Sequence, residues 1–237
     1  MELAGQLAVV TGAGRGIGEA ISKRLASMGA FVMLVARDME RLERVQREIQ
    51  SSGGSAQAAQ LDLLNEQSIA KFAENLCAHH GRCDILVNNA AIGSTGTPLH
   101  EMPPAEWDRL MATNLRGPYL MIRALTPMMI AAKSGHIINI SSLAGHNPLP
   151  RGAAYSASKW GLNGLTYSVA EELRPHNIRV SVIAPGSTNT RFEGQGDRKD
   201  PNKKIQPDDV GRIVAMLVTQ APQSFISEVL IRPTQKP

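Results

Sequence analysis

The segment "GAAYSASKWG", residues 152 to 161, places a phenol and an ammonium four positions apart, Tyr155 and Lys159. Residues at this spacing share one face of a helix. An isolated tyrosine has a pKa of about 10, too high for an efficient acid or base near neutral pH. A nearby ammonium favours the phenolate, so the pair predicts a tyrosine whose pKa Lys159 lowers. The alternative is a surface tyrosine stacked on a lysine stem.

The elements that would position this pair alternate along the chain. Strand character is found in "QLAVVTG", "AFVMLVA", "AQAAQLD", "DILVNNA", "HIINIS", "IRVSVIAPG" and "EVLIRPT". Helical periodicity covers residues 16–28, 38–52, 65–80, 105–132, 155–174 and 207–220. Several strands are apolar on both faces, as in a sheet covered by helices on each side. We therefore expect a Rossmann-type α/β fold, a doubly wound parallel sheet in a single domain spanning 1–237.

Composition narrows the class of protein. The 237 residues are 43% apolar and carry a net charge of +4, with acidic and basic residues interspersed. Only 4% are aromatic, too few to suggest a base-stacking surface, so no nucleic-acid partner is expected. No apolar run reaches the roughly 18 residues of a membrane span, and the N-terminus lacks signal-peptide character. A cytoplasmic protein with no membrane partner is predicted.

The run "CAHHGRC" brings Cys77, His79, His80 and Cys83 within seven residues. Structural zinc, however, needs four ligands that converge tetrahedrally, usually from two separated pairs. Gly81 is expected to end a helix and Cys83 to open the next strand, so the four side chains would diverge. No metal site is predicted.

After the first strand comes "TGAGRGIG", Thr11 to Gly18. Glycines allow positive φ and let the backbone approach a pyrophosphate at the start of the next helix. The spacing of Gly12, Gly16 and Gly18 differs from the commonest G-x-G-x-x-G fingerprint, and a simple turn is the alternative. Its position between a strand and a helix favours a dinucleotide site.

Six motifs follow one another in a single order: "TGAGRGIG", "NNAA", Asn114, "NISS", "YSASK" and "APGSTNT". In order and spacing they resemble the short-chain dehydrogenase/reductase family over residues 5 to 232. The resemblance implies an oxidoreductase with a catalytic tetrad of Asn114, Ser142, Tyr155 and Lys159. Ser142 would donate a hydrogen bond to a substrate carbonyl. Asn114 would keep a water that relays protons to Lys159.

The resemblance also implies contacts with a nicotinamide cofactor. The pyrophosphate would lie against Gly12, Gly16, Ile17 and Gly18. The adenosine would meet Asp62, Leu63, Asn89 and Ala90, with Ala91 in place of the family's usual glycine. The nicotinamide side would meet Pro185, Gly186, Thr188 and Thr190, and Tyr155 and Lys159 would also contact the cofactor, Lys159 at the nicotinamide ribose.

The form of the cofactor depends on the end of the second strand. NAD-preferring relatives place an acidic residue there to bind the ribose 2′-hydroxyl. This chain has Ala36 and then Arg37, and Arg15 approaches from the glycine loop. Two guanidinium groups suit a 2′-phosphate, so NADP(H) is predicted. A solvated loop arginine is the alternative for Arg37, and Asp38 is expected to cap the next helix.

These observations predict an NADPH-dependent reductase that converts a ketone or aldehyde to an alcohol, with Tyr155 as the acid. The resemblance implies a short lid at about 187–206, which would leave room for a small-molecule or carrier-borne carbonyl substrate; a disordered surface loop is the alternative. The resemblance favours 3-oxoacyl-[acyl-carrier-protein] reduction, although the ending "ISEVLIRPTQKP" is closer to small carbonyl or pterin reductases. A cofactor-binding sensor without turnover is the alternative of another class. The family also implies a homodimer or homotetramer that pairs helices 105–132 and 155–174.

Overall fold

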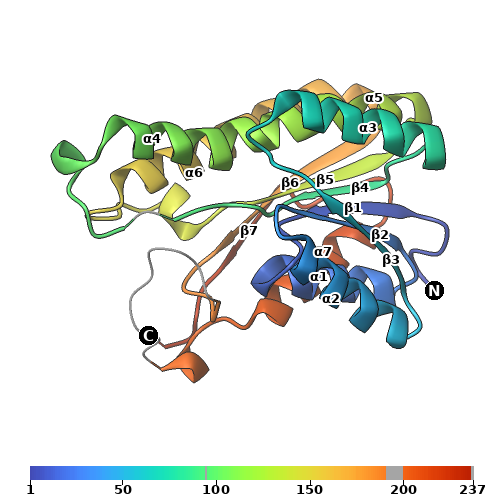
Figure 1. The fold of residues 1–237 in the computed structure, drawn as a ribbon, viewed down its shortest axis with the longest axis horizontal. Coiled ribbons are helices and arrows are strands. Elements are labelled where there is room, and N and C mark those ends of the chain that lie inside the picture. Colours follow the sequence, from blue (N-terminus) through green and yellow to red (C-terminus); the bar gives the residue numbers. More distant parts are fainter. Residues whose placement is uncertain (94, 191–199, 236–237) are drawn as a thin grey trace.

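Within residues 1–93, 95–190 and 200–235, which the computed structural model describes, seven parallel strands form one sheet in the order β3-β2-β1-β4-β5-β6-β7 (Figure 1). The strands are β1 Leu7–Thr11, β2 Phe31–Ala36, β3 Ser55–Gln60, β4 Ile85–Asn88, β5 Gly135–Ile140, β6 Ile178–Pro185 and β7 Glu228–Ile231. The chain starts at the centre, runs outward to β3, and returns to build β4 to β7 on the other side. The predicted Rossmann-type α/β fold in one domain is confirmed.

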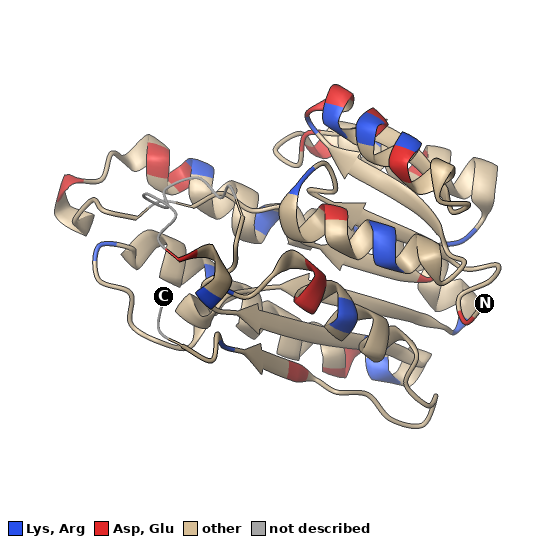
Figure 2. Cartoon of the chain, turned by 90° about the horizontal axis from the view of Figure 1, so that it is seen from below, with Lys and Arg blue, Asp and Glu red and all other residues tan. Residues whose placement is uncertain are grey.

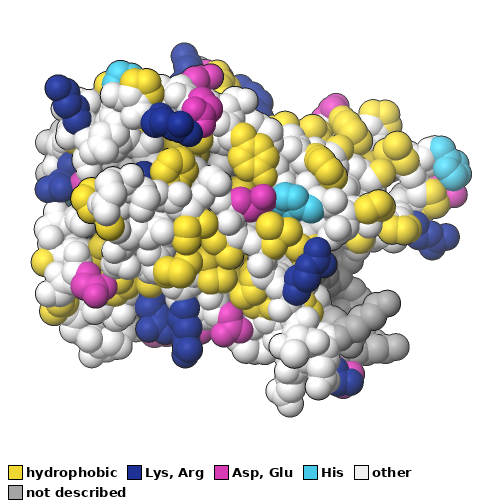
Figure 3. Space-filling view, turned by 180° about the vertical axis from the view of Figure 1, so that it is seen from behind, with side chains coloured by type: hydrophobic (Ala, Val, Ile, Leu, Met, Phe, Trp, Pro, Cys, Tyr) yellow, Lys and Arg dark blue, Asp and Glu magenta, His cyan; other side chains and the backbone are white. Residues whose placement is uncertain are grey.

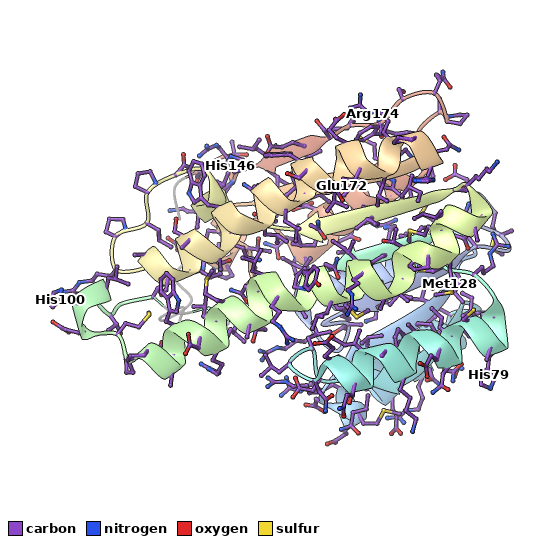
Figure 4. All side chains as sticks on the ribbon, turned by 90° about the horizontal axis from the view of Figure 1, so that it is seen from above. His79, His100, Met128, His146, Glu172 and Arg174 are labelled. Carbon is purple, nitrogen blue, oxygen red and sulfur yellow. The ribbon has the colours of Figure 1, made fainter. Side chains whose placement is uncertain are left out.

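Helices cover both faces of the sheet, which explains why its strands are apolar on both sides. Alternate residues of β1 point to opposite layers: Ala8 and Val10 join one buried cluster, Leu7 and Val9 the other. The first cluster contains residues of α1, α2 and α7, and the second contains residues of α3, α5 and α6, which lie side by side in Figure 4. The helices are α1 Gly16–Ser27, α2 Met39–Ser51, α3 Glu66–His80, α4 Pro104–Met111, α5 Gly117–Ala132, α6 Ala153–Leu173 and α7 Pro207–Val218.

The helix ends follow capping rules. Asp38 accepts a hydrogen bond from Arg41 N and so caps α2, as expected from the sequence. Gly81, at φ 66°, ends α3 in the left-handed conformation. Beyond it Cys83 is buried while Cys77 is exposed, and both are free thiols. Among the described residues no group of three metal-binding side chains comes together.

The predicted helix 105–132 is interrupted around Asn114. α4 ends at Met111, a π-helical turn follows over Ala112–Arg116, and α5 then begins at Gly117. Pro118 has no N–H, so the carbonyl of Asn114 cannot receive the hydrogen bond that an α-helix would supply from four residues on. The interruption therefore begins before Pro118 and contains Asn114 itself.

The predicted lid falls partly outside the described residues, because 191–199 belong to the undescribed part of the chain. Its two flanks lie together: Asn189 N donates to Ile205 O at 2.8 Å, and Ile205 N donates to Ser187 O at 3.0 Å. The described residues on either side of 191–199 are therefore adjacent in the fold. None of the helices in the described parts of the chain is long and apolar enough to cross a membrane.

Candidate active site

A cavity of about 1010 Å³ opens at the carboxyl ends of the parallel strands, where ligands bind in open α/β sheets. Segments that follow β1 to β6 contribute to its walls. Every predicted cofactor residue except Gly18 lines it, and so do three members of the predicted tetrad: Ser142, Tyr155 and Lys159. The fourth member, Asn114, lies buried beneath the wall.

The glycine loop lets three segments meet at the floor of this cavity. Gly12 and Gly16 adopt φ of 67° and 60°, which favours glycine at both positions. A Cβ on Gly12 would lie 2.9 Å from Ala90 Cα, and one on Gly18 would lie 2.3 Å from Gly12 O. Any larger side chain would therefore force the loop away from α1. The bare backbone and the N-terminus of α1 together fit a pyrophosphate.

Thr11 and Asn89 join the glycine loop to the segment after β4. Thr11 Oγ1 accepts hydrogen bonds from Asn89 N at 3.0 Å and Ala90 N at 3.1 Å, and Asn89 Nδ2 donates to Thr11 O at 2.9 Å. The sequence reasoning named Asn89 but missed Thr11, whose signal is a hydroxyl at the end of β1. Ala91 is not among the described residues with positive φ, so this position does not require a glycine.

Basic side chains gather at one end of the cavity. Arg15 precedes α1 and Arg37 follows β2, and both are exposed in the cavity wall. Asp62 lies beside them in the wall, and its Oδ1 accepts from Leu64 N at 3.0 Å. A third arginine, Arg41 in the first turn of α2, also lines this end. The sequence reasoning did not name Arg41 as a cofactor-binding residue, although a second arginine only four residues after Arg37 was a signal of basic character at this site.

Three side chains of the predicted tetrad lie at the other end. α6 begins at Ala153, two residues earlier than predicted, so Tyr155 and Lys159 both lie in its first two turns. The Tyr155 side chain is hydrogen-bonded to Ser142, which follows β5. Lys159 is 2% exposed, and its Nζ donates to Ile140 O at 2.9 Å. The same Nζ lies 5.8 Å from the centre of the Tyr155 ring.

Burial decides the proton affinities of this pair. It raises the pKa of Tyr155 to about 12, and the hydrogen bond with Ser142 only partly opposes the rise. It lowers the pKa of Lys159 to about 8. Desolvation therefore outweighs the lowering of the Tyr155 pKa that we predicted from Lys159, whose ammonium is held by Ile140 O.

Asn114 is 1% exposed and ties the site together from below. Its Oδ1 accepts from Ile92 N at 2.8 Å, and its Nδ2 donates to Ile92 O at 2.9 Å and to Ser158 Oγ at 3.2 Å. Ser158 belongs to α6, between Tyr155 and Lys159. The asparagine side chain thus connects the segment after β4 to the catalytic helix. Its role in a proton relay stays a prediction.

The segment after β6 closes the cavity against the glycine loop. Pro185 ends β6, and Thr188, which is 5% exposed, donates from Oγ1 to Gly186 O at 3.0 Å. A Cβ on Gly16 would lie 3.2 Å from Thr190 Cγ2. The predicted nicotinamide residues therefore lie opposite the pyrophosphate loop. Sequence reasoning missed the remaining wall at this end, Leu143, Asn147 and Leu149, because no motif marks it.

A doubly wound sheet, a glycine loop at the start of α1 and a Ser–Tyr–Lys cluster in one cavity define a Rossmann-fold oxidoreductase. The family model for short chain dehydrogenases matches residues 6–201, and the chain accordingly belongs to the short-chain dehydrogenase/reductase family.

The comparisons with individual proteins agree with this family. An uncharacterized oxidoreductase of Staphylococcus saprophyticus is 32% identical over 98% of this chain and 99% of its own. The crystal structure of a metagenomic short-chain oxidoreductase in complex with NADP is 58% identical, covers 100% of both chains and has a TM-score of 0.89. An alcohol dehydrogenase from the archaeon Thermococcus sibiricus, complexed with 5-hydroxy-NADP, is 28% identical over 98% of both chains, with a TM-score of 0.90.

Proposed function

We propose that the protein is an NADPH-dependent carbonyl reductase. The observation that carries this proposal is one cavity with Ser142, Tyr155 and Lys159 at one end and Arg15 and Arg37 at the other. The arginines fit a 2′-phosphate, and the glycine loop between the two ends fits the pyrophosphate. The relative that binds NADP and is 58% identical supports the same cofactor.

In this proposal the bound cofactor supplies a hydride for the carbonyl carbon of a ketone or aldehyde. The hydroxyl of Ser142 donates a hydrogen bond to the carbonyl oxygen and fixes its position. The phenol of Tyr155 gives its proton to that oxygen, which completes the alcohol. Lys159, which Asn114 and Ser158 help to position, holds the nicotinamide ribose and stabilises the phenolate that remains.

The substrate we propose is an uncharged carbonyl compound. Among the described residues that line the catalytic end, only Lys159 carries a charge, and Ile92, Leu143 and Leu149 give that wall an apolar character. A 3-oxoacyl thioester meets this description and is the leading specific substrate, carried by acyl carrier protein. A small ketone, aldehyde or pterin is the alternative.

A substrate panel tests the proposal. Purified protein with NADPH would be offered 3-oxoacyl thioesters, diketones, aldehydes and pterins, and cofactor oxidation followed by absorbance. Turnover of at least one class is expected, with NADPH preferred to NADH. If NADPH binds tightly and no carbonyl is reduced, the protein is a cofactor-binding sensor instead.

The variant Arg37→Ala tests the cofactor half of the proposal. A hydrogen bond to a charged group contributes about 1.5–3 kcal/mol, so its loss should lower kcat/KM for NADPH by roughly tenfold or more and leave NADH use unchanged. Ala36→Asp combined with Arg37→Ala should shift the preference further towards NADH, because the new carboxylate repels the phosphate. Equal use of both cofactors by the wild type would contradict the assignment.

A further inference from the structure

Asp38 and Arg41 form a closed pair at the basic end of the cavity. Asp38 Oδ1 accepts from Arg41 N at 3.1 Å, and Asp38 Oδ2 pairs with Arg41 Nε at 2.9 Å. Both residues line the cavity, as do Arg15 and Arg37. Among the described residues, Asp38 is the only carboxylate on the α2 side of this wall. Both of its oxygens are thus paired with Arg41.

The glycine loop holds this first turn of α2 in place. A Cβ on Gly14 would lie 3.1 Å from Arg41 Cβ, so the loop backbone packs directly against the arginine stem. One turn further on, Arg44 Nη2 donates to Gly14 O at 3.2 Å. Arg44 is itself held by Glu19 of α1 at 2.7 Å and by Glu48 of α2 at 2.6 Å. Figure 2 shows acidic and basic positions close together along helices of this layer. The position of Arg41 beside the cavity is therefore set by packing.

Arg41 keeps hydrogen-bonding capacity after it has paired with Asp38. Its Nε is used, while Nη1 and Nη2 have no hydrogen-bond partner within residues 1–93, 95–190 and 200–235. The guanidinium is planar and offers its donors in a fixed fork that matches phosphate oxygens. Asp38, by contrast, directly follows Arg37, and a free carboxylate there would repel a phosphate and attract a ribose hydroxyl.

We propose that Arg41 is a specificity-determining residue for 2′-phosphorylated cofactors. It cancels the charge of Asp38 and offers its Nη groups to the 2′-phosphate beside Arg15 and Arg37. The inference rests on the proposed use of NADP(H). It assigns the choice between NADPH and NADH to Arg41 and Asp38 in addition to Arg15 and Arg37. The sequence motifs point to Arg15 and Arg37 alone.

Four variants separate this role from a structural one. Arg41→Gln removes the charge and keeps a long polar side chain. Asp38→Asn removes the carboxylate and keeps the helix cap, since Asn caps as well as Asp. The double variant combines them. Arg47→Gln is the matched control, because Arg47 lies on the same helix, is 68% exposed and does not line the cavity.

Dissociation constants for NADPH, NADH and adenosine 2′-monophosphate would be measured by calorimetry. Arg41→Gln should weaken the binding of NADPH and of adenosine 2′-monophosphate by about three- to tenfold, the size expected when a half-exposed arginine loses its contact with a phosphate. The dissociation constant for NADH should stay within twofold of the wild-type value. The double variant should recover part of the lost NADPH affinity, because the Asp38 carboxylate, which Arg41→Gln leaves unpaired, is also removed. Arg47→Gln should change none of the three constants.

Two results would overturn the inference. Equal weakening of NADPH and NADH by Arg41→Gln would mean that the arginine only supports the fold. If the double variant binds NADPH no more tightly than Arg41→Gln does, Asp38 does not repel the 2′-phosphate and Arg41 has no charge to neutralise. A wild type that binds NADPH no better than NADH would instead contradict the proposed cofactor itself, so the two failures are distinguishable.

Discussion

At the scale of single residues, the site combines a half-buried phenol with a buried ammonium, and the two hold their protons with opposite shifts in affinity. Tyr155 holds its proton more tightly than a free tyrosine, while Lys159 holds its proton less tightly than a free lysine. A positive charge would develop on the nicotinamide only as its hydride is transferred, and a bound ribose would offer Lys159 a partner other than Ile140 O. We infer that the phenol becomes an effective acid as the hydride is transferred.

Tyr155→Phe should therefore abolish turnover, because it removes the proton that the carbonyl oxygen needs. The affinity for NADPH should change by less than about threefold, since one weak hydrogen bond is lost. Lys159→Ala should damage both turnover and NADPH affinity. Steady-state rates and NADPH titrations on the two variants measure this split. A Tyr155→Phe enzyme that retains most of the wild-type rate would rule out the mechanism.

At the scale of elements, close approach of backbones sets the shape of the site. α1 meets the glycine loop where Gly18 leaves no room for a side chain. α6 carries Tyr155 and Lys159, and the π-helical turn between α4 and α5 puts Asn114 beneath them. Each of these packing arrangements brings a predicted catalytic or binding group to the carboxyl edge of the sheet.

Gly18→Ala should destabilise the protein by about 1–3 kcal/mol, because its Cβ would overlap Gly12 O at 2.3 Å. NADPH binding should weaken with it, since the loop must move. Gly211→Ala is the matched control: this glycine also lies inside a helix, α7, and nothing comes closer than 3.4 Å to its Cβ position. It should stabilise by about 0.5–1 kcal/mol. Denaturant unfolding measures the free energy of unfolding of both variants. Equal changes in the two variants would contradict the packing argument.

The pairing of β5 with β6 contains a titratable group. His136 is 1% exposed, and its Nε2 lies 2.8 Å from Ser181 Oγ, whose hydroxyl donates to Ile226 O at 2.6 Å. The histidine therefore donates from Nε2, and its buried Nδ1 has no partner among the described residues. Burial, together with the nearby charge of Arg179, lowers the pKa of His136 to about 3.

Because the unfolded chain binds this proton near pH 6.5 and the folded protein only near 3, stability should be complete above pH 6.5 and fall below it. The loss should approach about 1.4 kcal/mol per pH unit between the two values. Melting temperatures of the wild type and His136→Gln, measured from pH 7 to 4, test the point. The variant should show a shallower decline, and parallel curves would exclude His136 as the cause.

At the scale of the whole molecule, the outer surface carries aromatic side chains that its own core does not use. Tyr119 on α5 is 45% exposed, and Trp160 and Tyr167 on α6 are 54% and 41% exposed. Figure 3 shows hydrophobic side chains gathered on the face turned away from the viewer in Figure 1. Self-complementary contact between two copies would cover such a surface.

We therefore expect a homodimer or homotetramer built on α5 and α6. Light scattering at micromolar concentration should give a mass that is a multiple of 25.5 kDa. Tyr119→Glu with Trp160→Glu should reduce the mass, because charges would be buried at the contact. Leu99→Glu, at a similarly exposed apolar residue outside these helices, should not. A monomeric wild type would refute the expectation.

The sequence by itself determined the order of strands and helices, the glycine loop and the spacing of Ser142, Tyr155 and Lys159. These features are local, because strand alternation, helical periodicity and glycine tolerance depend on near neighbours. It also indicated the basic residues Arg15 and Arg37, since Arg15 lies in the glycine loop and Arg37 directly follows the second strand.

Only the tertiary structure decided how these groups behave. The pKa of Tyr155 and Lys159 depends on burial by the surrounding segments, and spacing along a helix does not report burial. The contacts of Asn114 with Ile92 cross 22 residues of chain. Arg41 joins the cavity because its stem packs against Gly14, 27 residues earlier in the chain. Contacts between distant segments form only when the chain folds, which is why no local pattern contained them.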